Sequence, residues 1–161
     1  MKRKRIYLET SIFSYLAAHT SRDLVVSAWQ EVTQEFWDQH REAYDLVASQ
    51  LVVEECSVGD PDMVERRLAL LHGMRELVVD NAVKVVAAAL LSKGGVPRGA
   101  EFDALHIAVA AVGGADYLLT WNCRHLNNPV TKPRVRAICE HCGYVCPEIC
   151  TPFELTEGGL R

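Results

Sequence analysis

The segment RIYLETSIFSYL, residues 5–16, decides the fold, because a strand pattern passes directly into a helix pattern within it. The mostly apolar run at residues 5–8 predicts a short strand. Thr10 or Ser11 can cap the helix that follows, since a hydroxyl at that place accepts a hydrogen bond from the first turn. Glu9 therefore stands where the strand becomes the helix. Such a direct transition is typical of proteins in which strands and helices alternate.

The same alternation continues along the chain. Further strands are predicted at residues 43–48, 76–79, 116–121 and 144–149. Helices are predicted at residues 24–41, after Ser49, and at 62–74, 81–92, 100–112 and 130–142. Strands that alternate with helices of this length join through right-handed crossovers and form a parallel sheet covered on both faces. The predicted fold class is therefore α/β, with a central, mostly parallel sheet of about five strands in one domain, residues 1–161.

Length and composition exclude several classes of protein. The chain has 161 residues, 49% of them hydrophobic, which is enough for one core without the help of disulfides. Its apolar runs are far shorter than the roughly 20 residues that a membrane span needs. The basic residues at 2–5 lead into only a brief apolar run, so no signal peptide is predicted. We expect a soluble cytoplasmic protein without a membrane segment.

The formal net charge is −4, so no general basic field predicts nucleic-acid binding. Any contact with nucleic acid has to be local. Basic residues cluster at positions 2–5 and again at Lys132, Arg134 and Arg136. These clusters fit a solvated surface and a phosphate-binding surface equally well.

Four of the six cysteines, Cys139, Cys142, Cys146 and Cys150, fall close together around His141. Their spacing differs from the two compact pairs that are usual in zinc sites, and it resembles an iron–sulfur pattern without matching it. The alternative is that they pack in the interior, since free cysteine is among the most buried residue types. Packing is the favoured interpretation, and a zinc-dependent interaction module is the competing one.

Acidic and amide side chains follow the predicted strands at one edge of the sheet. Glu9 follows the first strand directly, and Glu55 lies in the helix after the second. Asp103 is early in an apolar helix, and Asn122 follows the fourth strand. Ligands of parallel sheets bind outside the carboxyl ends of the strands, so all four side chains can reach one site.

Asp103 is the most informative of these acids, because a carboxylate on an apolar segment costs free energy unless it is paired or bound to a metal. Each acid taken alone can also be a helix cap or a surface charge. Together, Glu9, Glu55 and Asp103 predict a site for Mg²⁺ or Mn²⁺, because these ions prefer hard oxygen ligands. Such ions serve the hydrolysis of phosphodiester bonds.

Four segments, taken in order, resemble the PIN domain family, and within it the VapC-like toxins of bacterial and archaeal toxin–antitoxin pairs. YLETS at residues 7–11 is similar to the family's opening motif of an acid followed by Thr and Ser or Asn. SQLVVEEC at 49–56 is similar to its Ser-to-Glu segment, where the spacing points to Glu55. DALHIA at 103–108 and ADYLLTWN at 115–122 resemble its third and fourth metal motifs. The resemblance spans nearly the whole chain.

The resemblance implies a three-layer α/β/α fold with Mg²⁺ or Mn²⁺ at the acidic cluster. It also implies endonucleolytic cleavage of RNA, a homodimer and neutralisation by a cognate antitoxin. Two positions depart from the family pattern, because Glu9 stands where an Asp is usual and Asn122 where an acid is usual. Asn122 removes a charge and keeps a carbonyl ligand, so one metal or two can be expected. A catalytically weakened PIN-like domain that binds RNA or a protein is the alternative.

Supporting roles are predicted for four more side chains. Thr10 and Ser11 can orient Glu9 or a metal-bound water, or they can cap the helix. Thr120 resembles the threonine that supports the family's fourth ligand position. His106 follows Asp103 by three residues, so it can act as a base or touch the substrate, or it can be a satisfied semi-buried histidine. Trp121 can stack on a base, although packing is favoured for it.

Overall fold

Five parallel strands form one central sheet in the computed structural model, which describes residues 2–159. The strands are β1 (Arg5–Leu8), β2 (Asp45–Ser49), β3 (Arg75–Leu77), β4 (Tyr117–Leu119) and β5 (Glu148–Cys150). Their order across the sheet is β3-β2-β1-β4-β5, and every neighbouring pair is parallel. The α/β class and the parallel five-stranded sheet predicted from the sequence are confirmed.

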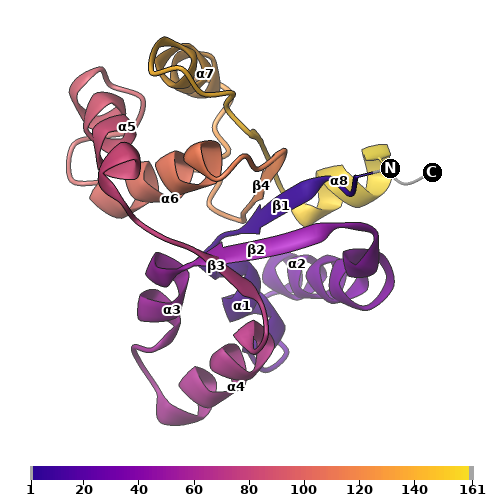
Figure 1. Ribbon diagram of the computed structural model, residues 1–161. Coiled ribbons are helices and arrows are strands. Elements are labelled where there is room, and N and C mark those ends of the chain that lie inside the picture. Colours follow the sequence, from indigo (N-terminus) through magenta and orange to yellow (C-terminus); the bar gives the residue numbers. More distant parts are fainter. Residues whose placement is uncertain (1, 160–161) are drawn as a thin grey trace.

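The helices form a layer on each face of this sheet (Figure 1). The helical segments are α1 (Thr10–Ala17), α2 (Leu24–Glu35), a π-helical turn (Phe36–His40), a 3-10 turn (Arg41–Ala43), α3 (Gln50–Cys56), α4 (Pro61–Leu71), α5 (Asn81–Ser92), α6 (Glu101–Val112), α7 (Lys132–His141) and α8 (Pro152–Gly159). Helices α5, α6 and α7 pack together on one face, and α1 to α4 lie with α8 on the other. The three-layer arrangement follows from the direction of the crossovers. Within the described residues, no helix has the length and apolar character that crossing a membrane requires.

The strand order places a topological switch point between β1 and β4. From β1 the chain moves outward through β2 to β3, then returns across the sheet to β4 and continues outward to β5. The connection that follows β1 therefore leads toward one edge of the sheet, and the connection that follows β4 leads toward the other edge. A crevice at such a point, outside the carboxyl ends of the strands, is where open parallel sheets bind ligands.

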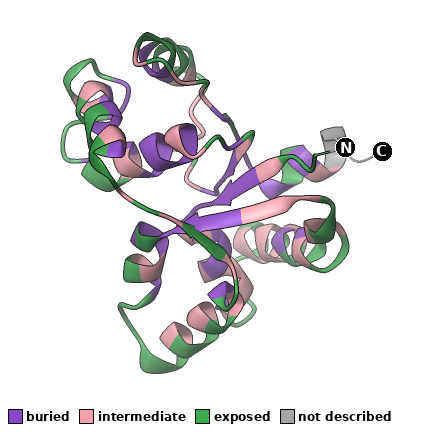
Figure 2. Cartoon of the chain, in the orientation of Figure 1, coloured by how far each residue is buried: buried purple, intermediate pink, exposed green. Residues whose placement is uncertain are grey.

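The core lies where the central strands meet both helix layers. Ile6, Tyr7 and Leu8 of β1 and Leu118 and Leu119 of β4 are fully buried. Figure 2 shows the same distribution, with buried residues along the central strands, the edge strand β3 mostly exposed, and exposed residues on the outer sides of the helices. Because both faces of a parallel sheet are covered, its strands are continuous apolar runs rather than alternating ones. Glu9 therefore lies at the edge of this buried core, directly after the last residue of β1.

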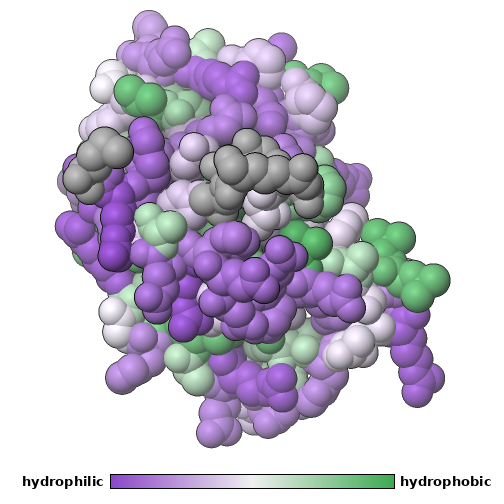
Figure 3. All heavy atoms as spheres, turned by 90° about the vertical axis from the view of Figure 1, so that its right-hand side faces the viewer, coloured by the Kyte–Doolittle hydropathy of each residue, from purple (hydrophilic) through white to green (hydrophobic). Residues whose placement is uncertain are grey.

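The surface carries hydrophobic side chains singly rather than in one broad area. The large exposed ones are Leu24, Val25, Val58, Val78, Val85, Phe102, Val130, Val145 and Phe153. Figure 3 shows one face, on which hydrophobic side chains stand in small separate groups among hydrophilic ones. Scattered apolar residues of this kind are ordinary on protein surfaces.

The structure differs from the sequence prediction mainly near the C-terminus. The last strand is shorter than the predicted segment 144–149 and begins at Glu148. Helix α8 was not predicted, although TPFE at 151–154 is a capping box with proline at the first helical position. The amide of Thr151 donates to Glu154 Oε1 at 3.1 Å, and the amide of Glu154 donates to Thr151 Oγ1 at 3.3 Å. Only α5 has the predicted bounds.

Truncation of a central strand residue tests the packing of the sheet. Leu118→Ala is expected to lower the free energy of unfolding by about 2 to 5 kcal/mol, because Leu118 is fully buried between β1 and β5. Leu24→Ala is the matched control, since the same truncation on a side chain that is 86% exposed is expected to cost about 0.5 kcal/mol or less. Urea unfolding followed by circular dichroism measures both. Equal losses in the two variants would contradict the described core.

Candidate functional site

The candidate site lies at the carboxyl ends of β1 and β4, at the switch point of the sheet. Glu9 follows β1, and its amide donates a hydrogen bond to the carbonyl of Leu119 at the end of β4 at 3.1 Å. The carboxyl group is carried into this junction with only 8% of the residue exposed. A charge buried to this extent needs partners, because burial without them costs free energy.

The Glu9 carboxylate has three hydrogen-bond donors. Ser11 Oγ and Thr120 Oγ1 each donate to Glu9 Oε1 at 2.6 Å, and the amide of Ser11 donates to Oε2 at 3.2 Å. Glu9 is therefore the N-cap of α1, and the prediction that Thr10 or Ser11 caps this helix is wrong. A carboxylate at a helix N-terminus is favoured by the exposed amides and by the helix dipole. Ser11 and Thr120 thus hold Glu9, and Thr120, predicted to support the position of Asn122, also accepts from the backbone amide of Asn122.

Glu55 lies on α3, whose first turn is capped by Ser49 on the neighbouring strand β2. Thr10 Oγ1 donates to Glu55 Oε1 at 2.8 Å, and His106 Nε2 contacts the same oxygen. Burial by itself raises the pKa of Glu55, but the hydrogen bond and charge of His106 and the hydroxyl of Thr10 lower it below the ordinary value. Thr10 thus supports Glu55 rather than Glu9.

His106 is more deeply buried than the sequence indicates. The residue is 1% exposed, and its Nδ1 contacts the hydroxyl of Tyr7 at 2.7 Å while Nε2 contacts Glu55. The Tyr7 hydroxyl also contacts Ser49 Oγ at 2.8 Å. Both ring nitrogens are occupied by protein groups, so the structure favours the satisfied buried histidine over a direct contact with substrate. Tyr7 and Ser49 were not singled out for this network, since they are an apolar strand residue and a cap in the sequence pattern.

Asp103, in the first turn of α6, is held by the loop after β4. Asn122 Nδ2 donates to Asp103 Oδ1 at 3.3 Å, and His125 Nδ1 contacts Oδ2 at 2.9 Å. Asn122 Oδ1 accepts from the amide of His125 at 2.9 Å, so its carbonyl oxygen is already occupied. The backbone amide of Asn122 donates to Thr120 Oγ1 at 2.9 Å. Because Thr120 Oγ1 also donates to Glu9, this contact connects Asp103 and Asn122 to Glu9.

The motifs do not single out His125, although the sequence carries a signal for it. It lies three residues after Asn122, in the loop that follows a central strand, where ligand-binding residues of α/β proteins gather. Its side chain is 33% exposed, compared with 20% for Asp103. His125 is therefore the histidine of the site that solvent and a ligand can reach.

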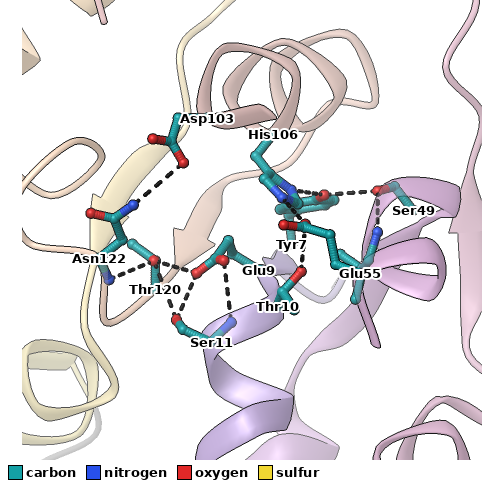
Figure 4. Close-up of polar contacts among 11 residues, drawn as sticks. Tyr7, Glu9, Thr10, Ser11, Ser49, Glu55, Asp103, His106, Thr120 and Asn122 are labelled. Carbon is teal, nitrogen blue, oxygen red and sulfur yellow. Dashed lines mark hydrogen bonds and ion pairs between the residues drawn. The ribbon is translucent and has the colours of Figure 1, made fainter. Parts of the chain in front are cut away.

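Figure 4 shows two polar groups with Glu9 between them. Asp103 and Asn122 form one group, and Glu55 and His106 belong to the other. Thr120 joins Glu9 to the first group, and Thr10, the next residue after Glu9, reaches the second. Three carboxylates from three distant segments thus lie along one edge of the sheet, as the sequence predicted.

The donor chemistry at this edge fits Mg²⁺ or Mn²⁺, because carboxylate oxygens are the ligands that these ions prefer. Glu55 Oε2 has no hydrogen-bond partner among the described residues, and Glu9 Oε2 has one. Within residues 2–159, however, no three acidic, histidine or cysteine side chains are gathered closely enough to hold an ion together. An ion shared by Glu9, Glu55 and Asp103 has to draw these side chains inward.

Trp121 packs in the interior, as favoured from the sequence. It is 8% exposed, its ring stacks on Trp29 with 5.1 Å between centroids, and its Nε1 donates to Thr33 Oγ1 at 2.7 Å. Its backbone amide donates to Ser11 Oγ at 2.9 Å. Trp121 therefore fixes the loop that carries Asn122.

The basic residues of α7 make structural contacts. Lys132 donates to the carbonyl of Ile149 at 3.1 Å, Arg134 to the carbonyl of Gly94 at 3.4 Å, and Arg136 to Glu148. At the opposite end of β1 from Glu9, Arg5 donates to Asp45 Oδ2 at 2.7 Å, and Lys4 lies 3.6 Å from Asp116. These contacts account for the three basic residues of α7 and for two of the four at residues 2–5 without a phosphate.

The four C-terminal cysteines are not gathered into a group that could hold a metal ion. Cys139 lies in α7, Cys142 at its C-cap, Cys146 in the loop before β5, and Cys150 in that strand. Cys139 and Cys150 are buried, all four are free thiols, and no cluster of metal ligands occurs in the described part of the chain. The structure favours packing over the zinc-dependent module.

Acid titration tests the contacts of Glu55. Because its pKa is lower in the folded chain, the ionised carboxylate contributes stability that is complete above the unfolded pKa of 4.5 and is lost as the pH falls through the folded pKa. The difference in unfolding free energy between the wild type and Glu55→Gln is expected to be largest at neutral pH and to shrink on acidification. Urea unfolding at a series of pH values measures it, with Glu54→Gln, an exposed neighbour, as the control. A difference that grows on acidification would contradict the assigned contacts.

Comparison with known proteins connects the chain to solved structures. No protein-family model matches the sequence, and no curated protein matches it. The crystal structure of VapBC2 from Rickettsia felis bound to a DNA fragment from its promoter contains a chain with a TM-score of 0.53 to this one, at 15% sequence identity. The likeness covers 91% of this chain and 98% of that chain. This likeness and the parallel five-stranded sheet together show the three-layer α/β/α fold that the resemblance implied.

Proposed function

We propose that this protein is a divalent-metal-dependent endoribonuclease that hydrolyses phosphodiester bonds of RNA. The observation that carries the proposal is the placement of Glu9, Glu55 and Asp103 at the switch point of the parallel sheet. Each acid comes from a different segment, and each is held by hydroxyl, imidazole or amide donors from other segments. Such a set of acids concentrates negative charge at one edge, which attracts a divalent cation.

The chain's own residues bind and orient in this reaction. Glu9, Glu55 and Asp103 would hold the ion, which is Mg²⁺ or Mn²⁺. When bound, the ion lowers the pKa of a water molecule and stabilises the charge that develops on the phosphate. Without a cation the three carboxylates repel an RNA phosphate, so RNA binding and ion binding depend on each other. His125, the exposed histidine beside Asp103, lies where it can contact the RNA.

A toxin of a toxin–antitoxin pair is the biological role that fits best. The four motifs resemble VapC-like toxins, and the fold resembles a chain of the VapBC2 complex. A cognate antitoxin is then the protein partner, RNA is the substrate, and a homodimer in the cytoplasm is the expected form. The overall negative charge agrees with an enzyme that meets RNA only at a local site.

Cleavage of labelled RNA in the presence of Mn²⁺ tests the proposal. Asp103→Ala and Glu55→Ala are each expected to lower the cleavage rate by about 100-fold or more, because even residues that only support metal ligands are worth about 10- to 100-fold. Glu101→Ala and Glu54→Ala are matched controls, since each removes an exposed acid close in sequence to the acid tested. The controls are expected to cleave like the wild type. Equal cleavage by all four variants would show that another protein or another site is responsible.

A catalytically weakened PIN-like domain that binds RNA or a partner protein is the second candidate. It is favoured by Asn122, whose amide donates to Asp103 where the family pattern has an acid, and by the spread of the three acids. Calorimetric titration with Mn²⁺ separates the two candidates. The nuclease is expected to bind Mn²⁺ stoichiometrically and to lose this binding in Asp103→Ala.

The weakened domain is expected to show no saturable heat with Mn²⁺. In that case Asn122→Asp, which supplies the missing acid, is expected to create Mn²⁺ binding where the wild type has none. Tight binding by the wild type, weakened by Asp103→Ala, would rule out the second candidate.

A further inference from the structure

A series of hydrogen-bonded, buried polar side chains ends at Glu55 and is not used by the proposed reaction. Tyr7 and Ser49 are fully buried and His106 is 1% exposed, yet all three carry polar atoms. Burying such groups costs free energy unless each is hydrogen-bonded. Here Ser49 Oγ, Tyr7 OH and His106 Nδ1 are joined by contacts of 2.8 and 2.7 Å, and His106 Nε2 continues the chain to Glu55 (Figure 4).

The direction of these hydrogen bonds follows from the chemistry of the two ends. An ionised carboxylate only accepts, so the hydrogen between His106 and Glu55 is on Nε2. A tyrosine hydroxyl keeps its proton at neutral pH, because its ordinary pKa is about 10. That hydroxyl can donate to one neighbour and accept from another, and it has two neighbours, Ser49 Oγ and His106 Nδ1.

Hydrogen bonds on both ring nitrogens fix the orientation of the imidazole. A half-turn of the ring would place carbon atoms opposite Tyr7 and Glu55, and both buried partners would lose a hydrogen bond. Tyr7 belongs to β1, Ser49 to β2 and His106 to α6, so the orientation is set by the sheet and by one helix layer together. The ring is therefore a rigid donor aimed at Glu55.

At Glu55 this donor and Thr10 occupy the same oxygen, Oε1. The other oxygen, Oε2, has no partner among the described residues. Two donors from α6 and α1 thus hold Oε1 and leave Oε2 for an ion. Partners of this kind orient metal ligands and typically change metal affinity 10- to 100-fold.

We propose that His106, Tyr7 and Ser49 are positioning residues that act through Glu55 to set the affinity of the site for a divalent metal. The inference rests on the proposed function, because it takes Glu55 as a ligand of the ion. It assigns no contact with RNA to any of the three. It also gives the polar atoms of β1 and β2 a role that neither strand pattern indicates.

Two substitutions at position 106 separate positioning from packing. Both His106→Gln and His106→Asn remove the ring from the same buried place. The amide nitrogen of Gln reaches about as far as Nε2, so it can keep the hydrogen bond to Glu55. The amide of Asn reaches only about as far as Nδ1, so it can keep the contact with Tyr7 while the donor to Glu55 is lost.

Calorimetric titration with Mn²⁺ is expected to give an affinity about tenfold or more higher for His106→Gln than for His106→Asn, because only Gln can keep the donor to Glu55. Tyr7→Phe removes only a hydroxyl and is expected to weaken Mn²⁺ binding about tenfold, because the ring loses its fixed orientation. Thermal unfolding of each variant reports packing separately. Equal Mn²⁺ affinity in His106→Gln and His106→Asn would overturn the inference. If neither variant folds, unchanged affinity in Tyr7→Phe would overturn it.

The failure of this inference is distinguishable from the failure of the proposed nuclease. A wild-type protein that binds Mn²⁺ but cuts no RNA refutes the nuclease, and the comparison of the position 106 variants still decides the role of His106. If the protein cuts RNA but its Mn²⁺ affinity is unchanged by the substitutions at His106 and Tyr7, only the inference is refuted. A nitrogen-15 NMR spectrum that shows no hydrogen on Nε2 of His106 in the wild type would overturn the inference without any metal.

Discussion

The junction between β1 and β4 is the constraint on which the site depends. The two strands are neighbours in space but are far apart in sequence. The segments that follow them lead toward opposite edges of the sheet. Glu9 holds this junction twice, through its amide to Leu119 and through its carboxylate to Thr120. The carboxylate is buried where it caps helix α1. The same position places it at the edge of the sheet where a ligand can bind. Structure and proposed chemistry thus use one side chain.

The other two acids are tied to this junction by short side chains. Thr10, in α1, donates to Glu55. Thr120 accepts from the backbone amide of Asn122, whose side chain donates to Asp103. Hydroxyl groups suit this task because one oxygen can donate to a carboxylate and accept from an amide at the same time. The spacing of the acids is therefore set by a continuous hydrogen-bonded framework, and not by the acids themselves, which repel one another.

The sequence predicts the sheet well because buried parallel strands and amphipathic helices have clear periodicities, and α5 was placed to the residue. It points to the three acids as site candidates because Glu9 directly follows a strand, Glu55 lies in the helix after the next strand, and Asp103 lies in the first turn of an apolar helix. It does not show that Glu9, rather than Thr10 or Ser11, caps α1, because the pattern allows any of these residues. The partners are also hidden, since Tyr7 looks like any buried strand residue and His125 like any loop residue. Their roles depend on contacts between segments that only the folded chain brings together.

The hydrogen bonds of the three acids also bear on when the fold is complete. Glu9, Glu55 and Asp103 each have donors supplied by the protein, so none of them is left as an uncompensated charge. Under the proposed function, the ion would bind to a fold that these hydrogen bonds already complete, and only the side chains of the three acids would have to shift toward it. Removal of free metal would then stop the proposed reaction without unfolding the chain.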